Sequence, residues 1–349
     1  MATTQLLPGT LLPWFEHHGR HDLPWQHPRT PYRVWLSEVM LQQTQVATVI
    51  PYFLRFLERF PDLAALAAAP ADALMAHWAG LGYYARARNL QAAARACVQH
   101  HDGQLPRDLQ ALMALPGIGR STAAAILSQA WGDRHAILDG NVKRVLTRVF
   151  GIEGHPGVPA VERALWQLAE QQLQAVPDGR MTDWTQAQMD FGATLCTRAR
   201  PACALCPLQQ QCLALRDGRV AELPTRKAGK TLPEREAHAL LADDGQGRYA
   251  LLRRPERGIW AGLWTLPQAD THAGLAQWML TGLGADLEQA DTLTTISHTF
   301  SHYRLQLHVY RLRCSSRQRI GETAAGWFDR VQLAALGLPA PIRKLIDSL

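Results

Sequence analysis

Apolar residues recur at helical spacing through the first two thirds of the chain. Residues 31–60 are apolar with few helix breakers apart from Pro51, and residues 64–79 and 85–100 are rich in alanine, a strong helix former. Shorter helical patterns cover 109–115 and 122–130. The glycines gather in short turns, and no segment alternates as a strand does. The pattern predicts an all-α region over residues 1–222.

The pattern changes after Leu223. Residues 223–233 are polar and basic, which is typical of a linker, and period-two alternation begins beyond them. Two strand patterns, 237–242 and 248–253, flank the turn 243–247 and predict a hairpin. The clearest strand covers 303–312, and residues 331–338 favour a helix. Residues 234–349 are therefore predicted to form an α+β domain. The apolar positions that alternate in the clearest strand are Tyr303, Leu305, Leu307 and Val309.

Length and charge set broad limits on the class of protein. A chain of 349 residues is expected to hold two domains. A formal net charge of +6 favours an anionic partner, although many ordinary proteins share such an excess. No stretch is long and apolar enough to cross a bilayer, and the first residues lack the features of a signal peptide. We therefore expect a cytoplasmic protein in a reducing compartment, with no membrane partner.

Four of the six cysteines are densely clustered within residues 196–212. Their intervals of six, two and five residues differ from the paired short clips of most structural zinc sites. Thiolates select zinc or iron–sulfur clusters, and this spacing favours a cluster with four iron corners. The other two cysteines, Cys97 and Cys314, fit ordinary packing positions. The predicted ligands are Cys196, Cys203, Cys206 and Cys212.

A glycine-bearing turn, LPGIGRST at 115–122, joins two helical patterns. Gly117 and Gly119 let the backbone approach a ligand closely, and the following helix directs its positive N-terminus at a phosphate. This is the form of a helix-hairpin-helix, which grips a nucleic-acid backbone without reading bases. An ordinary helix–turn–helix connection explains the turn equally well.

Two acidic residues stand in unlike surroundings. Glu38 lies in an apolar helical pattern, so inward burial would raise its pKa and let it hold a proton at neutral pH. Asp139 precedes an amphipathic helix that Asn141 can cap, and the helix dipole with Lys143 and Arg144 favours its ionised form. Each has a simpler explanation, a solvent-facing glutamate and a turn aspartate respectively.

Taken together, these features point to one chemistry. Cleavage of a glycosidic bond through a cationic transition state needs one carboxyl group that donates a proton and one that stays ionised. A phosphate-gripping hairpin and a cysteine-rich basic loop accompany the pair here. The combination predicts a glycosylase that acts on a base in DNA.

At this point the chain resembles a known family, the adenine DNA glycosylases or MutY family, through nearly its whole length. The resemblance implies an all-α helix-hairpin-helix glycosylase domain with an iron–sulfur cluster loop, followed by an α+β Nudix-like domain. The motifs that carry it are LSEVMLQQT (36–44), GLGYYARARNL (80–90), LPGIGRST (115–122), LDGNV (138–142), TFSH (299–302) and the cysteine run.

The resemblance implies a substrate and a mechanism. The substrate is duplex DNA with adenine mispaired with 8-oxoguanine or, less strongly, guanine. Glu38 would protonate adenine N7 and later activate water, and Asp139 would stabilise the sugar cation, with or without a covalent adduct. Similar enzymes of the endonuclease III type carry a catalytic lysine where this chain has Ser121, so the resemblance implies a monofunctional enzyme.

Further site residues follow from the same resemblance. Ser121, Gln186 and Trp25 would support the active site, and Phe300, Ser301 and His302 would sense 8-oxoguanine. The resemblance also implies one 4Fe-4S cluster, room for a monovalent cation at the hairpin, and a monomer associated with a bacterial nucleoid. The residues implied to contact DNA are Gln42, Gln43, Thr44, Leu81, Tyr83, Gly117, Gly119 and Arg120.

Three alternatives stay open. An endonuclease III-like lyase shares the hairpin and the cluster but needs the lysine. A DNA-binding regulator without catalysis would not need Glu38 and Asp139. A Nudix hydrolase fits the segment GLWTLP (262–267), but the residues that follow, Asp270, Thr271, His272 and Gln277, lack the acidic metal-binding set. We therefore expect the second domain to recognise its target without hydrolysing it.

Overall fold

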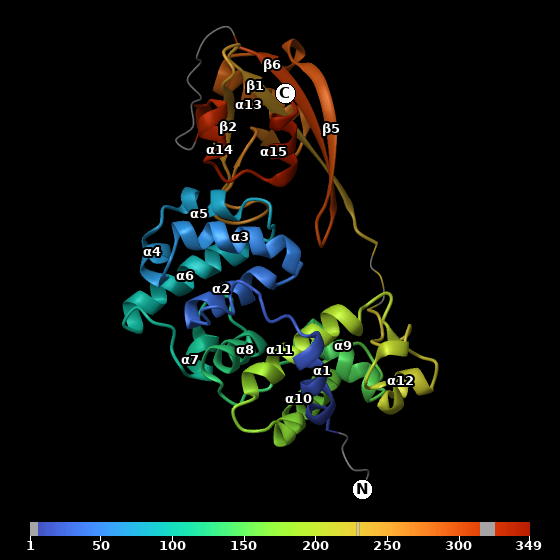
Figure 1. The fold of residues 1–349 in the computed structure, drawn as a ribbon. Helices are drawn as coiled ribbons and strands as arrows, with labels where there is room; N and C mark the ends of the chain where they lie inside the picture. The colour runs from blue at the N-terminus through green and yellow to red at the C-terminus, as the bar shows by residue number, and fades with distance from the viewer. Residues whose placement is uncertain (1–5, 228, 230, 315–324) are drawn as a thin grey trace. The chain divides into compact units, whose positions relative to one another are not determined.

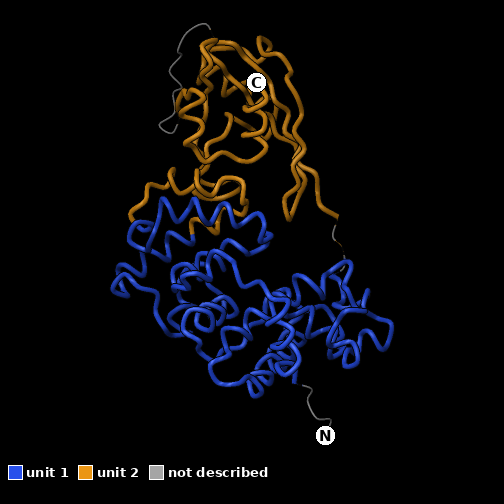
Figure 2. Tube along the Cα trace, viewed as in Figure 1, with its two compact units in different colours: residues 1–67, 89–228 blue, residues 68–88, 229–349 orange. Residues whose placement is uncertain are grey.

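The computed structural model describes residues 6–227, 229, 231–314 and 325–349. The chain divides into two units that alternate along the sequence (Figure 2). The first unit is Met1–Ala67 with Asn89–Ala228, and the second is Ala68–Arg88 with Gly229–Leu349. The domain ranges 1–222 and 234–349 and the linker between them stay predictions about the chain.

The first unit is helical, as the apolar periodicity predicts (Figure 1). Side-chain caps begin several of its helices: Thr30 accepts a hydrogen bond from the backbone N–H of Arg33 at 3.3 Å, and Asp108 accepts one from Ala111 at 2.8 Å. The helices that lie wholly within it include α1 (Pro8–His18), α2 (Pro31–Leu41), α3 (Val46–Arg59), α7 (Leu109–Ala114), α8 (Arg120–Trp131), α9 (Gly140–Val149), α10 (Pro159–Gln172), α11 (Met181–Asp190) and α12 (Leu213–Arg216).

Two predicted helical stretches are interrupted. Residues 31–60 form α2 and α3, separated by the turn at 42–45, where Gln43 adopts a positive φ of 59°. Residues 64–79 form α4 (Leu63–Ala68) and α5 (Ala71–Trp78), which Pro70 separates because it cannot donate a backbone hydrogen bond. The predicted helix 85–100 is confirmed as α6 (Ala85–His100).

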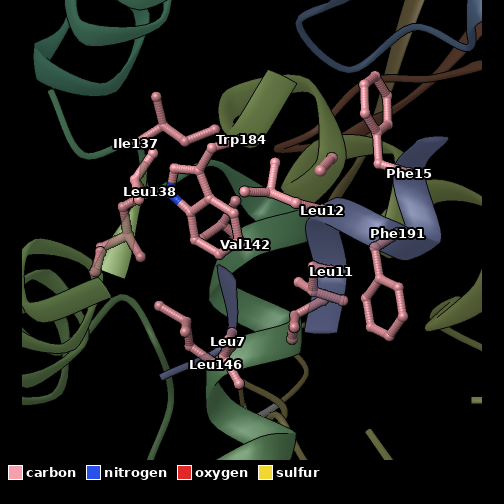
Figure 3. Close-up of a cluster of buried hydrophobic side chains, with 14 of the residues drawn as sticks. Leu7, Leu11, Leu12, Phe15, Ile137, Leu138, Val142, Leu146, Trp184 and Phe191 are labelled. Carbon is pink, nitrogen blue, oxygen red and sulfur yellow. The ribbon is translucent and has the colours of Figure 1, made fainter. Parts of the chain in front are cut away.

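Helix α8 lies at the centre of the first unit. Its residues from Ala123 to Gln129 are all buried, and it contacts both α2 and α11. Beside it, leucines of α1 pack with Trp184 of α11 and with Val142 and Leu146 of α9 (Figure 3). This core holds the N-termini of α8 and α9 in place, and two of the predicted active-site residues, Ser121 and Asp139, stand at those termini.

The second unit is built on a mixed sheet in the order β3-β2-β1-β6-β5, with β4 paired to β1 and β7 to β2. Strands β1 and β6 are parallel, and the other pairs are antiparallel. The strands are β1 (Glu234–Asp243), β2 (Tyr249–Arg253), β3 (Trp264–Thr265), β4 (Gln268–Ala269), β5 (Asp291–Thr299), β6 (Arg304–Arg313) and β7 (Ala325–Phe328).

The strand predictions for this unit are confirmed where the periodicity was clear. Strands β1 and β2 form the predicted hairpin, and β6 buries Leu305, Leu307 and Val309 on one face. The predicted helix 331–338 is wrong in length, because α14 (Arg330–Ala334) ends before Gly337, whose carbonyl accepts a hydrogen bond from Trp264. Two helices of this unit, α13 (His272–Leu283) and the short α15 (Ala340–Asp347), were not predicted.

Candidate active site

A cavity of about 720 Å³ in the first unit contains both predicted catalytic acids. Glu38 reaches it from α2 and Asp139 from the N-terminus of α9. The two residues are 101 positions apart in the sequence (139 − 38). They are brought together because α2 and α11 both pack on α8, and α9 packs on α11. The shared cavity satisfies the geometric requirement for a pair of acids that act on one group.

Glu38 is held in its neutral form by its surroundings. Its neighbours on α2, including Trp35, Leu36 and Val39, are buried, and Glu38 itself is half-buried where it lines the cavity. Burial, and secondarily the nearby Asp139 carboxyl, raise the pKa of Glu38 to about 8. A general acid at neutral pH requires a pKa near that range.

Asp139 receives the hydrogen bonds that Glu38 lacks. Its Oδ1 accepts the backbone N–H of Val142 at 2.8 Å, and its Oδ2 accepts the side-chain amide of Asn141 at 3.1 Å. Among the residues that the structure describes, no side chain or backbone N–H donates to the Glu38 carboxyl. Burial raises the pKa of Asp139, while these hydrogen bonds and Arg144 oppose that rise. A proton shared by the two acids therefore lies on Glu38.

Two expectations about this site need correction. Asp139 itself, not Asn141, caps α9. The sequence argument for Asp139 also considered only the effects that favour its ionised form, whereas burial acts in the other direction and has the larger effect on its pKa. The ionised form of Asp139 is therefore favoured, relative to that of Glu38, by specific hydrogen bonds.

Asn141 connects the Asp139 carboxyl to the cysteine loop through Arg144. The Arg144 guanidinium donates to Asn141 Oδ1 at 2.8 Å, to the Gly192 carbonyl at 2.6 Å and to the Cys196 carbonyl at 2.8 Å. Gly192 permits this close approach, because a Cβ there would lie 2.6 Å from the Asn141 Cβ. The sequence placed Asn141 and Arg144 near the site but did not show this network.

Ser121, Trp25 and Gln186 all line the cavity, as the resemblance implies. The Ser121 hydroxyl accepts a hydrogen bond from the backbone N–H of Leu138 at 2.9 Å, which ties α8 to the segment that carries Asp139. Trp25 is buried and packs edge-on against Phe53. Arg20 and Gln129 also line the cavity, and no local sequence pattern indicated them.

The hairpin between α7 and α8 has the backbone that its glycines predict. Gly117 adopts a φ of 78°, and a Cβ there would lie 2.8 Å from the Asn89 Cβ. Gly119 caps α8 in extended conformation, with open space around it. Arg120 stacks on Trp166, 3.9 Å from the ring centre, and pairs with Glu170. Contact of these residues with DNA stays a prediction.

The remaining residues predicted to contact DNA differ in exposure. Gln42 and Thr44 line the cavity, and Gln43 is exposed beside it in the chain. In the second unit, Tyr83 is 53% exposed with a φ of 50°, whereas Leu81 is only 6% exposed. The side chain of Leu81 is therefore held inside that unit, and Tyr83 is the accessible member of the pair.

The four clustered cysteines line one small, apolar cavity of about 20 Å³ together with Phe191, Leu195 and Leu208. Burial raises the pKa of the Cys206 thiol to about 11. Among residues 6–227, 229, 231–314 and 325–349, no three potential ligands converge closely enough to hold one metal ion. Four thiols around one cavity are a soft donor set that fits a metal centre bound by thiolates.

In the second unit, Phe300, Ser301 and His302 form the turn between β5 and β6. Ser301 and His302 are exposed, while Phe300 packs on Trp260 and His298 with ring centres 5.6 and 4.6 Å apart. Helix α13, which Thr271 caps, carries no acidic residue in its sequence HAGLAQWMLTGL. The turn thus presents two polar side chains on an aromatic base.

Comparisons with known proteins agree with this architecture. Residues 36–171 match the model of the HhH-GPD superfamily base excision DNA repair protein, and residues 238–348 match the NUDIX domain. The structure titled a thermostable thymine-DNA glycosylase is similar with a TM-score of 0.55 and 30% identity, covering 60% of this chain and 95% of that one. The fold and the site define a helix-hairpin-helix base excision repair glycosylase with a NUDIX domain.

Full-length relatives narrow that class. The adenine DNA glycosylase of Buchnera aphidicola (subsp. Schizaphis graminum) is 34% identical over 97% of this chain and 96% of its own. That of Homo sapiens is 33% identical over 97% of this chain and 72% of its own. The chain belongs to the adenine DNA glycosylase family. The predicted family, the enzyme class and the fold class of a helical helix-hairpin-helix domain followed by a NUDIX-like domain are thereby confirmed, and the iron–sulfur cluster loop stays a prediction.

No helix within the described ranges has the length and apolar character needed to span a membrane. The cytoplasmic location, the nucleoid association and the monomeric state stay predictions.

Proposed function

We propose that this chain hydrolyses the N-glycosidic bond of adenine mispaired with 8-oxoguanine or guanine in duplex DNA. The observation that carries the proposal is the placement of Glu38 and Asp139 in one cavity, with hydrogen-bond donors on Asp139 alone. The cavity, at about 720 Å³, has room for a nucleobase that has left the duplex.

The chemistry follows from the two protonation states. Glu38 donates its proton to adenine N7, the C1′–N9 bond breaks with its electron pair leaving on the base, and neutral adenine departs. The Asp139 carboxylate stabilises the positive charge on the sugar. Water then adds to C1′, and its proton returns to Glu38, which restores the starting state. This scheme needs no covalent adduct with Asp139.

The same site supports release of the base without strand cleavage. A lyase forms a Schiff base between an amine and the sugar. Ser121 offers a hydroxyl instead, and that hydroxyl is bonded to the backbone of Leu138. Borohydride should therefore fail to trap this enzyme on its product, whereas a trapped adduct would favour the endonuclease III-like alternative.

DNA is the proposed partner of a basic groove of about 600 Å³ in the first unit. It lies beside the N-terminus of α9 and includes cationic side chains from the cysteine loop and from the chain after Leu223. Such a surface binds phosphates with an affinity that falls as salt rises. Its cationic members are Lys143, Arg144, Arg148, Arg198, Arg226 and Lys227.

Two further groups complete the proposal. Cys196, Cys203, Cys206 and Cys212 would hold one 4Fe-4S cluster, which would cross-link residues 196–212 and keep Arg198 in the groove. The turn of Phe300, Ser301 and His302 would recognise 8-oxoguanine, and the acid-free α13 supports recognition without Nudix hydrolysis. The amino-acid sequence and the site offer no separate support for a cation at the hairpin.

The decisive experiment is single-turnover release of adenine from a duplex with adenine opposite 8-oxoguanine, compared with adenine opposite thymine. We expect release from the first duplex only. Glu38→Gln should bind the first duplex and release adenine at least about a hundred-fold more slowly, as loss of a general acid implies. Equal release from both duplexes, or full activity of Glu38→Gln, would refute the proposal.

A further inference from the structure

An ion pair lies at the wall of the cavity, which Arg20 lines and behind which Asp190 is buried. Asp190, at the end of α11, has 0% of its surface exposed and pairs with Arg20, which is 170 positions away in the sequence. Arg20 donates to Asp190 from its Nε at 2.8 Å and from its backbone N–H at 2.7 Å. Neither Glu38 nor Asp139 takes part in this arrangement, and the mechanism above does not use Asp190.

The ion pair also holds Gln186, which is one helical turn before Asp190 and lines the cavity. The Gln186 amide nitrogen donates to Asp190 Oδ1 at 2.8 Å, and its carbonyl oxygen accepts from the Gln129 amide at 3.2 Å. A carboxylate paired with arginine only accepts hydrogen bonds. Turning the Gln186 amide over would place its oxygen against the Asp190 carboxylate, so the amide has one permitted orientation.

We propose that Asp190 is a positioning residue that fixes the polarity of the Gln186 amide and so makes the cavity select a base with an exocyclic amino group. The inference rests on the proposed function and names what its site discriminates. In adenine, the amino group at C6 lies next to N7, where Glu38 donates. An acceptor is needed there, and the fixed carbonyl oxygen of Gln186 supplies one.

The competing base is hypoxanthine, which differs from adenine by a carbonyl oxygen at C6. Against a fixed amide oxygen, that carbonyl would meet a second acceptor and would be left without a hydrogen-bond donor in a buried site. A site built around a hydrogen bond rejects analogues that cannot make it far more strongly than an apolar pocket does. If the amide could turn, its N–H₂ group would donate a hydrogen bond to the hypoxanthine carbonyl oxygen and the selection would weaken.

A purely structural role for the Asp190–Arg20 pair predicts a different outcome. Loss of a structural contact would lower stability and slow release of both bases in similar proportion. Loss of an orienting contact changes the ratio of the two rates. The ratio of adenine to hypoxanthine release therefore separates the two roles.

The test measures single-turnover release of adenine and of hypoxanthine opposite 8-oxoguanine by the full-length protein. Asp190→Ala removes the acceptor, and we expect the adenine-to-hypoxanthine rate ratio to fall about ten-fold or more, the effect of losing one buried hydrogen bond. Asp190→Asn keeps an oxygen for Gln186 and should restore the ratio to within about three-fold of wild type. Asp190→Ser, whose hydroxyl is too short to reach Gln186, replaces Asp190→Ala if thermal unfolding shows that the alanine variant is not folded.

Thr194→Val is the matched control. It removes the hydrogen bond of 2.8 Å from the Thr194 hydroxyl to the backbone carbonyl of Asp190 but leaves the Asp190 carboxylate in place, so the ratio should stay near that of wild type. A folded Asp190→Ala or Asp190→Ser with an unchanged ratio would overturn the inference alone, as would an equal fall in Thr194→Val. Failure of the wild-type protein to release adenine would overturn the proposed function, and the inference with it.

Discussion

The side-chain amide of Asn141 donates to the Asp139 carboxylate, with Nδ2 3.1 Å from Oδ2, while its own oxygen accepts from Arg144. Asn141 is therefore oriented by one partner and orients the other. The arrangement gives Asp139 a hydrogen bond that the neighbouring Glu38 does not have. It is the feature that separates the protonation states of two acids sharing one cavity.

Replacing Asn141 should disturb that separation. In Asn141→Ala the pKa of Asp139 should rise further, because a hydrogen bond to the charged form is lost while burial remains. We expect single-turnover adenine release to slow about ten- to a hundred-fold at neutral pH, in line with the about 1.5–3 kcal/mol of a hydrogen bond to a charged group. The low-pH limb of the rate profile should move to higher pH. A slower rate with an unmoved limb would mean that Asn141 acts on shape alone.

The pH dependence of the rate should report both acids. Glu38 acts only while protonated, and its pKa is about 8, so adenine release should decline as pH rises through about 8. Release should also decline at low pH, where Asp139 takes up a proton. Single-turnover rates over the range from about pH 5 to about pH 10 would show this bell shape. A rate that stays constant through about pH 9 would exclude Glu38 as the proton donor.

The raised pKa of Glu38 should also lower the free energy of unfolding as pH rises through a defined window. The folded protein keeps a proton on Glu38 up to about pH 8, whereas the unfolded chain releases it near the ordinary pKa of 4.5. Since the unfolded state binds fewer protons between these values, the wild-type free energy of unfolding falls as pH rises through the window. Glu38→Gln has no such proton to lose.

The unfolding free energy of Glu38→Gln should therefore match that of wild type near pH 4.5. Above about pH 8 it should exceed the wild-type value by roughly a few kcal/mol. Urea unfolding at the two pH values measures the difference. Glu58→Gln, at an exposed position of α3, serves as the control and should show no such growth. A pH-independent difference would argue against a buried, protonated Glu38.

The hairpin offers a paired test of backbone geometry. Gly117→Ala should lower the unfolding free energy by about 1–2 kcal/mol for its positive φ, with a further cost from the contact at Asn89, and should weaken duplex binding. Gly119→Ala, at negative φ with open space around it, should be nearly neutral for stability. Denaturant unfolding and duplex binding of the two variants would separate strain from function. Equal losses in both would mean that the turn's positive φ is unimportant.

Several local features could be predicted from residues close together in the chain. The helix 85–100, the hairpin of β1 and β2 and the alternating face of β6 all follow from spacing within about ten residues. Element ends were less predictable. The helix expected at 331–338 stops at Ala334 because the backbone at Gly337 pairs with Trp264, a partner 73 positions earlier (337 − 264).

The residues of the candidate site also fall into those that could be predicted from the sequence and those that could not. Glu38, Asp139 and the four cysteines could be picked out from residue type and spacing, since apolar neighbours, helix starts and short intervals are visible along the chain. Arg20, Gln129 and Asp190 could not, because their partners lie on helices far away in the sequence. Burial of Asp139 was missed for a related reason: a residue at a helix N-terminus is open or enclosed according to what packs over it.

Local pattern thus specified which chemical groups this protein has and which backbone shapes it uses: helices, a glycine hairpin, clustered thiols and two acids in unlike settings. Packing of whole helices specified which of those groups meet. The protonation of Glu38 and Asp139 and the orientation of Gln186 depend on burial and on hydrogen bonds across as many as 170 residues. Such contacts form only when the core closes, because electrostatic environment is a property of what surrounds a group in space and not of its neighbours in the chain.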